Sequence, residues 1–210
     1  MKYKLIVFDM DGVILKVDNF WTRMHYKYNT VHPGLELTEK YLKTDIKKLA
    51  DEVIGKLWKG KSADGFYELM DTAVYNPGVE ETFAELKKLG IKTCILTSGP
   101  VQLAQRAKKK LGIDKVYGNE IIIKGNIITG DYNWLSLDFK HKGENFLKIC
   151  REFDVNPKEA IAVGDNEQDI YKFEKAGLSI AFNSSSEKLK KSADIVIESN
   201  DLRKVLEFVE

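Results

Sequence analysis

Cysteine is scarce in this sequence, and neither sign of charge is in excess. Only Cys94 and Cys150 are cysteines among the 210 residues, and each lies in an apolar segment without CxxC spacing. We therefore expect both to be reduced and packed in the interior of a cytoplasmic protein. Lysine and arginine number 33 against 32 aspartates and glutamates. Because a dedicated nucleic-acid-binding protein carries a basic surplus, no nucleic acid partner is expected, and a small anion suits the chain better.

Long hydrophobic runs and clustered histidines are also missing. The apolar run within residues 1–8 is too short for a signal peptide or a membrane span, and no later run is long enough. The sequence therefore predicts no membrane partner. His25, His32 and His141 are far from one another and from any cysteine pair, which argues against a zinc site.

Short apolar runs rich in valine and isoleucine alternate with longer amphipathic segments. Five such runs read as buried strands: residues 5–8, 91–96, 160–163, 178–181 and 195–197. This alternation is typical of a parallel sheet covered by helices on both faces. With 43% hydrophobic residues, the chain can bury the core of one domain that carries an insertion. We expect an α/β fold with a Rossmann-like, three-layer parallel sheet.

Two segments interrupt the alternation. Residues 19–75 show helical periodicity without a convincing strand, which predicts an inserted helical cap. Residues 120–131 place Lys124-Gly125-Asn126 between two isoleucine runs, a turn chemistry that favours a small β-hairpin. We therefore predict a core domain of residues 1–15 and 77–210 and a cap domain of residues 16–76.

The first predicted strand runs directly into Asp9-Met10-Asp11-Gly12. Ligands of open α/β sheets bind where strands end, so two carboxylates are expected at a binding edge. Burying both is costly unless a cation or a proton compensates their repulsion. The alternative is that Asp9 and Asp11 cap a turn in which Gly12 supplies a permissive backbone.

Three later positions repeat the pattern of polar groups at strand or helix ends. Ser98 and Gly99 follow the second strand and precede a predicted helix, where a hydroxyl and main-chain amides can hold an anion or form an N-cap. Asp165 and Asp169 follow the third strand, and helix-start polarity explains Asp165 poorly. Lys142 opens the helix before that strand and is either a phosphate partner or solvated surface.

Taken together, these motifs resemble those of the haloacid dehalogenase-like hydrolases. The resemblance covers roughly residues 3–15 and 77–199, and Gln168 stands where the fourth motif usually carries asparagine. The helical insertion resembles the C1-type cap of this family. The hairpin around Gly125 is similar to one in its phosphoserine phosphatase branch.

The resemblance implies a magnesium-dependent phosphatase that acts on a small phosphorylated metabolite. It implies that Asp9 is the nucleophile, that Asp11 is the general acid and base, and that Asp9, Asp11 and Asp165 hold Mg²⁺. In the same way it implies that Ser98, Gly99 and Lys142 bind phosphate, with Lys142 also catalytic, and that Asp169 supports the metal site. A monomer or a homodimer is expected.

Two other functions are consistent with the sequence. A phosphomutase of the same superfamily could carry Asp-Gly-Val-Ile after the nucleophile, as residues 11–14 do. An inactive phosphometabolite-binding protein would explain the altered stretch at residues 166–168. Within the cap, Asp18 stands near the position of an amine-reading glutamate of phosphoserine phosphatases. Residues 54–60 offer no counterpart of their carboxylate-binding arginine, so the sequence leaves the substrate open.

Overall fold

The structure is a computed structural model that describes residues 2–16, 19–135 and 140–209. Within these residues seven strands form one sheet in the order β4-β3-β2-β1-β5-β6-β7. The strands are β1 Leu5–Phe8, β2 Lys92–Pro100, β3 Lys115–Lys124, β4 Ile127–Asn133, β5 Ala160–Gly164, β6 Leu178–Phe182 and β7 Ile195–Ile197. Neighbouring strands are parallel except for β3 and β4.

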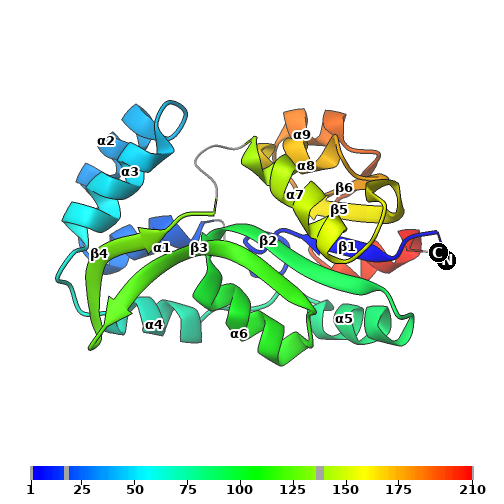
Figure 1. Cartoon of the computed structure of the whole chain (residues 1–210), viewed down its shortest axis with the longest axis horizontal. Helices are drawn as coiled ribbons and strands as arrows, with labels where there is room; N and C mark the ends of the chain where they lie inside the picture. The colour runs from blue at the N-terminus through cyan, green and yellow to red at the C-terminus, as the bar shows by residue number, and fades with distance from the viewer. Residues whose placement is uncertain (1, 17–18, 136–139, 210) are drawn as a thin grey trace.

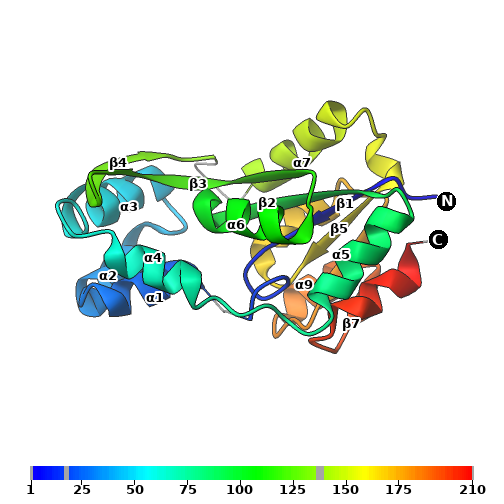
Figure 2. The same ribbon diagram turned by 90° about the horizontal axis from the view of Figure 1, so that it is seen from below.

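Helices cover both faces of this sheet, as Figures 1 and 2 show. One face carries α5 Val79–Lys88, α6 Val101–Leu111 and the 3₁₀ helix η4 Leu202–Phe208, and the other carries α7 His141–Glu152, α8 Ile170–Phe173 and α9 Glu187–Ser192. Two further 3₁₀ turns, η2 Pro157–Glu159 and η3 Glu167–Asp169, flank β5. The expected three-layer α/β architecture is confirmed.

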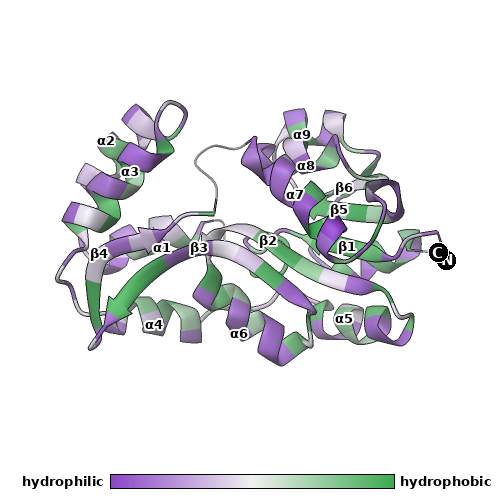
Figure 3. Ribbon diagram, in the orientation of Figure 1, coloured by the Kyte–Doolittle hydropathy of each residue, from purple (hydrophilic) through white to green (hydrophobic). Residues whose placement is uncertain are grey.

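Side-chain alternation along β1 explains why both faces are covered. Ile6 and Phe8 belong to the apolar cluster on one side of the sheet, while Leu5 and Val7 belong to the cluster on the other. All four side chains are fully buried, as expected for a central parallel strand. Figure 3 shows the same arrangement as hydrophobic strands surrounded by helices with hydrophilic outer surfaces.

Residues between β1 and α5 form helices, in agreement with the sequence prediction. These helices are α1 Phe20–Lys27, α2 Val31–Tyr41, α3 Ile46–Glu52, a π-helical turn η1 Val53–Leu57 and α4 Asp64–Asp71. They lie beyond the carboxyl ends of β1 and β2, next to the far end of the β3–β4 hairpin (Figure 1). The division into a core domain and a cap domain stays a prediction.

The hairpin is part of the main sheet, whereas a small separate hairpin was expected. β3 pairs with β2 in parallel through residues 115–119 and only then turns back, at Gly125 and Asn126, to pair with β4. Both turn residues have positive φ, 55° and 62°, as two-residue hairpin turns require. The tip contacts the turn between η1 and α4, because Gly60 N–H donates to the Ile128 carbonyl (2.9 Å). The hairpin therefore joins the helical segment to the sheet.

The end of the second strand differs from the prediction, whereas the state of the two cysteines agrees with it. β2 continues through Pro100 instead of ending at Leu96, because its last residue still pairs with Asn119 of β3 across an irregular register. Cys94 and Cys150 are free and buried, as expected. Among the described residues no helix is both long and apolar enough to cross a membrane.

Candidate active site

The register of the central strands places Asp9 between the carboxyl ends of β2 and β5. Phe8 lies opposite Ile95 of β2 and opposite Val163 of β5, and Asp9 N–H donates to the Val163 carbonyl (2.9 Å). Because all three strands are parallel, their carboxyl ends meet at one edge of the sheet. Asp9, the end of β2 that contains Ser98, and the loop that contains Asp165 therefore converge, although 156 positions separate Asp9 from Asp165 in the sequence.

Asp9 is buried and paired with Lys142 from the first turn of α7. The Lys142 ammonium lies 3.0 Å from Asp9 Oδ1, and both side chains are 5% exposed. Burial raises the pKa of Asp9 above its ordinary value, although Lys142 opposes the rise. Burial acts to lower the pKa of Lys142, but the carboxylates of Asp169 and Asp9 raise it above its ordinary value. Lys142 is therefore a permanent cation beside Asp9.

The Asp169 carboxylate accepts hydrogen bonds from the loop after β5 and forms ion pairs with two lysines. Its Oδ2 accepts hydrogen bonds from the main-chain N–H groups of Asp165 (3.1 Å) and Asn166 (3.3 Å). Its Oδ1 lies 2.6 Å from the ammonium of Lys142 and 2.7 Å from that of Lys172. Although burial acts to raise the pKa of Asp169, the two lysines lower it to about 2. Asp169 is thus ionised and is held by two main-chain N–H groups and two lysine side chains.

Asp165 lies against the loop that follows β1. A Cβ atom added to Gly12 would lie 2.0 Å from Asp165 Oδ2, and Gly12 has a φ of +76°. The close approach and the left-handed backbone both require glycine here. Burial and the nearby charges of Asp9 and Asp169 raise the pKa of Asp165 to about 8.

The carboxylates fit a divalent cation. Asp9, Asp165 and Asp169 each offer an oxygen, and these atoms lie within 4.8 Å of one another. Hard cations such as Mg²⁺ prefer carboxylate oxygens, and a cation would remove the repulsion that raises the pKa of Asp165. Since Asp169 is already neutralised by lysines, Asp9 and Asp165 are the side chains best placed to hold the ion. The expected third ligand, Asp11, has its carboxylate outside this cluster.

The Asp11 carboxylate instead lies by the first helix of the insertion. Its Oδ2 accepts a hydrogen bond from the Phe20 N–H (3.0 Å), whereas its buried Oδ1 has no hydrogen-bond partner among the described residues. Burial raises the pKa of Asp11 to about 7, with a further contribution from Asp9. A carboxyl group with such a pKa can both donate and accept a proton near neutral pH.

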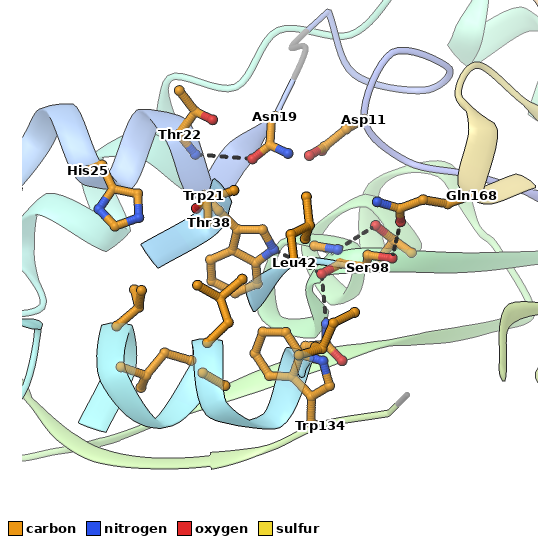
Figure 4. A pocket seen from close by; sticks show the side chains of 18 of the residues that line it. Asp11, Asn19, Trp21, Thr22, His25, Thr38, Leu42, Ser98, Trp134 and Gln168 are labelled. Carbon is orange, nitrogen blue, oxygen red and sulfur yellow. Dashed lines mark hydrogen bonds between the residues drawn. The ribbon is translucent and has the colours of Figure 1, made fainter. Parts of the chain in front are cut away.

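Ser98 is held from three sides. Its hydroxyl donates to Gln168 Oε1 (2.8 Å), and its carbonyl accepts hydrogen bonds from Trp21 Nε1 (2.9 Å) and Asn119 Nδ2 (2.7 Å). Figure 4 shows Trp21 and Gln168 reaching Ser98 from opposite sides. The N–H of Gly99 donates to Thr97 Oγ1 (2.8 Å). Gln168, the departure from the usual fourth motif, therefore occupies the hydroxyl that was predicted to bind phosphate.

A cavity of about 190 Å³ connects these polar groups with the inserted helices. Asp9, Asp11, Ser98, Gly99 and Lys142 all line it. Asp165 and Asp169 do not line it but form the carboxylate cluster with Asp9. The structure thus gathers the seven predicted site residues around one cavity and the carboxylate cluster next to it.

Sequence reasoning missed several neighbours of the site. Lys172 follows Asp169 by three positions, a helical spacing that could have suggested the pair. Asn119 and Trp21 carried no such signal, because their contacts with Ser98 arise only when the hairpin and α1 meet β2. Asp18, the expected counterpart of an amine-reading glutamate, lies outside the described residues.

Comparisons with known proteins agree with this geometry. Residues 3–177 match the family model of haloacid dehalogenase-like hydrolases. The phosphoserine phosphatase of Methanocaldococcus jannaschii is 39% identical over 63% of this chain and 62% of its own length. Its counterpart from Albidiferax ferrireducens is 29% identical over 98% of this chain and 89% of its own length.

Another curated relative, the phosphoserine phosphatase of Archaeoglobus fulgidus, is matched over only 58% of its length. The chain thus spans about three fifths of these two archaeal relatives. Among solved structures, a phosphoserine phosphatase described as a phospho-aspartyl intermediate analogue superposes with a TM-score of 0.86, at 30% identity and with both chains fully covered. The chain therefore belongs to the haloacid dehalogenase-like hydrolases, on their phosphoserine phosphatase-like branch.

Proposed function

We propose that this protein is a Mg²⁺-dependent phosphatase that hydrolyses a small phosphate monoester through an aspartyl-phosphate on Asp9. One observation carries the proposal. The Asp9 carboxylate lies on the cavity wall, 3.0 Å from the Lys142 ammonium and within 4.8 Å of a carboxylate oxygen of Asp165. A buried acid in such a setting can attack phosphorus only if cationic groups compensate the repulsion between two anions.

In the first step an Asp9 oxygen attacks phosphorus, and the bond from phosphorus to the leaving oxygen breaks. Lys142 balances negative charge on the transferring group, and the Asp11 carboxyl gives its proton to the leaving alcohol. In the second step Asp11 takes a proton from water, the water oxygen bonds to phosphorus, and the bond between phosphorus and the Asp9 oxygen breaks, which restores Asp9 and releases inorganic phosphate. Mg²⁺, held by Asp9 and Asp165, would supply further charge neutralisation on the phosphate oxygens.

Ser98 has a conditional role in this scheme. Its hydroxyl points to Gln168, so it must rotate away from that partner to donate to a phosphate oxygen. Its main chain is fixed by Trp21 and Asn119. We propose that residues 16–76 act as a cap domain, since Trp21 joins α1 to the phosphate-binding strand end.

Hydrolysis is preferred over the two alternatives. A phosphomutase needs room to reorient a phosphorylated intermediate, whereas Asp11 is positioned to activate water and the relatives compared above are described as phosphatases. An inactive binding protein would not need to keep Asp9 buried beside both Lys142 and Asp165, because a buried acid cluster without a task is costly.

The test is phosphate release by wild-type protein and by Asp9→Asn, with Mg²⁺ and with EDTA, over a panel of phosphate monoesters. Asp9→Asn is nearly isosteric and leaves Lys142 paired with Asp169 (2.6 Å), so we expect a folded variant by circular dichroism with a loss of activity of at least about 1,000-fold, a typical scale for a lost nucleophile. Beryllium fluoride, an acyl-phosphate mimic, should stabilise the wild type in Mg²⁺ and not the variant. Full activity of Asp9→Asn would refute the assignment.

A further inference from the structure

The cavity wall contributed by the inserted segment is mainly apolar, and its polar lining residues are Asn19, Thr22, His25 and Thr38. Nine apolar side chains line the cavity, among them Trp21, Leu42, Ile46, Ile54, Trp58 and Trp134. Figure 4 shows Asp11, Ser98 and Gln168 on one side and His25 with the helix α3 on the other. The cavity therefore has a polar region at the sheet edge and an apolar region beneath the helices.

No described lining residue in the apolar region carries a charge. The charged lining residues are Asp9, Asp11 and Lys142, all at the sheet edge. His25 is the remaining titratable residue on the wall, and burial lowers its pKa below the ordinary value while its Nδ1 pairs with Thr30 Oγ1 (2.8 Å). Arg23 acts on Asp11 electrostatically but does not line the cavity.

The indole rings add apolar surface without free donors at two positions. Trp21 Nε1 is used by the Ser98 carbonyl, and Trp58 Nε1 donates to Thr30 Oγ1 (3.1 Å). The Trp21 ring is stacked with those of Trp58 and Trp134, at centroid distances of 6.2 Å and 5.8 Å. These rings are therefore fixed by the protein and present hydrocarbon to a ligand.

A zwitterionic leaving group does not suit this wall. The ammonium and carboxylate of phosphoserine would lose water on entering the apolar region, and the described wall offers no opposite charges to replace it. An uncharged hydrocarbon group has no hydrogen bonds to water to lose there, and the removal of its surface from water favours binding.

We propose that the cavity takes phosphate monoesters of uncharged, mainly apolar alcohols, with phosphate at the sheet edge and the hydrocarbon against the tryptophans and α3. This assignment rests on the proposed function for its phosphate end and deepens it at the other end. It separates this chain by substrate class from the phosphoserine phosphatases to which it is similar.

The kinetic test compares phosphoserine with methyl, butyl and hexyl phosphate in Mg²⁺. The expected result is that kcat/KM rises with chain length, by up to about fourfold for each added methylene, the ratio that corresponds to burial of one such group. Hexyl phosphate should exceed phosphoserine by at least tenfold. A flat series, or faster release from phosphoserine, would overturn the inference and leave the proposed phosphatase function standing.

Binding can be followed without turnover, because the chain has three tryptophans and all of them line the cavity. Hexyl phosphate and inorganic phosphate do not absorb where indole emits, so either can be titrated against tryptophan fluorescence of the Asp9→Asn variant. Hexyl phosphate should bind at least tenfold more tightly than inorganic phosphate. If no ester is hydrolysed but this preference holds, the proposed function fails and the cavity assignment stands. Equal affinities would overturn the assignment.

A matched pair of leucines tests the position of the hydrocarbon. Leu42 lines the cavity and is half-buried, whereas Leu35 of the preceding helix is 60% exposed and does not line it. Leu42→Ala should lower kcat/KM for hexyl phosphate about tenfold and leave inhibition by inorganic phosphate unchanged. Leu35→Ala should change neither value. An equal response of both variants would contradict the proposed placement.

Discussion

The Lys172 ammonium lies 2.7 Å from Asp169 Oδ1, and both side chains are completely buried. Lys142 approaches the same oxygen at 2.6 Å and also contacts Asp9 at 3.0 Å. Asp169 is therefore shared by two lysines, of which only Lys142 reaches the predicted nucleophile. Since a buried carboxylate retains its charge only with compensation, Lys172 allows Lys142 to serve Asp9 as well.

Replacing Lys172 by methionine should harm both stability and catalysis. Methionine fills a similar volume but leaves Asp169 with Lys142 alone, so the free energy of unfolding should fall by about 3 kcal/mol. We expect kcat to fall about tenfold, because Lys142 is drawn toward Asp169 and away from Asp9. Urea unfolding and phosphate release measure the two effects. Lys175→Met is the matched control, since Lys175 is 43% exposed, and it should behave like wild type.

Stability without metal should fall as pH rises. The pKa of Asp165 is raised to about 8 and that of Asp11 to about 7, from 3.8. The folded chain thus binds more protons than the unfolded chain between about pH 4 and 8, so unfolding becomes easier across this window. Mg²⁺ should therefore raise the melting temperature more at pH 8 than at pH 5.5. In Asp165→Asn the metal-free pH slope should be shallower, and an unchanged slope would contradict the burial argument.

Gly12→Ala should weaken Mg²⁺ binding. The new Cβ would lie 2.0 Å from Asp165 Oδ2, so the Asp165 carboxylate must leave its present position in the cluster with Asp9. Gly90 offers a matched control, because it has a similar positive φ (+70°) but nothing within 4 Å of an added Cβ. Both variants should lose about 1 kcal/mol or more of stability from backbone strain. Only Gly12→Ala should need a higher Mg²⁺ concentration for half-maximal activity, at least tenfold by titration.

Trp21→Phe tests the connection between α1 and the sheet edge. Phenylalanine keeps a ring but removes the hydrogen bond from Nε1 to the Ser98 carbonyl (2.9 Å). A neutral hydrogen bond contributes about 1 kcal/mol, so we expect about a fivefold loss in kcat/KM for the preferred ester. Tyr26→Phe, on the same helix at an exposed position, should have no effect. A normal rate for Trp21→Phe would show that this contact does not position Ser98.

Local sequence patterns were sufficient for the sheet and for the loops that carry charge. Apolar runs such as residues 5–8 and 160–163 mark central strands because a strand buried on both faces favours a near-continuous series of apolar residues. Parallel pairing then brings the residues after these strands to one edge, which made the proximity of Asp9 and Asp165 predictable. β3 was harder to recognise, since Tyr117, Gly118 and Asn119 lack that apolar character.

The sequence by itself determined which residues carry charge at the strand ends, because hydrophobic periodicity and parallel geometry depend on local order along the chain. Only the tertiary structure decided how those charges are compensated. Asp169 takes two lysines, Asp11 turns toward Phe20, and Gln168 reaches Ser98. The apolar cavity wall was also decided at that level, since helices distant in sequence must pack together before their side chains enclose a common space. Coulombic and packing interactions act through space, and the chain order alone does not specify those distances.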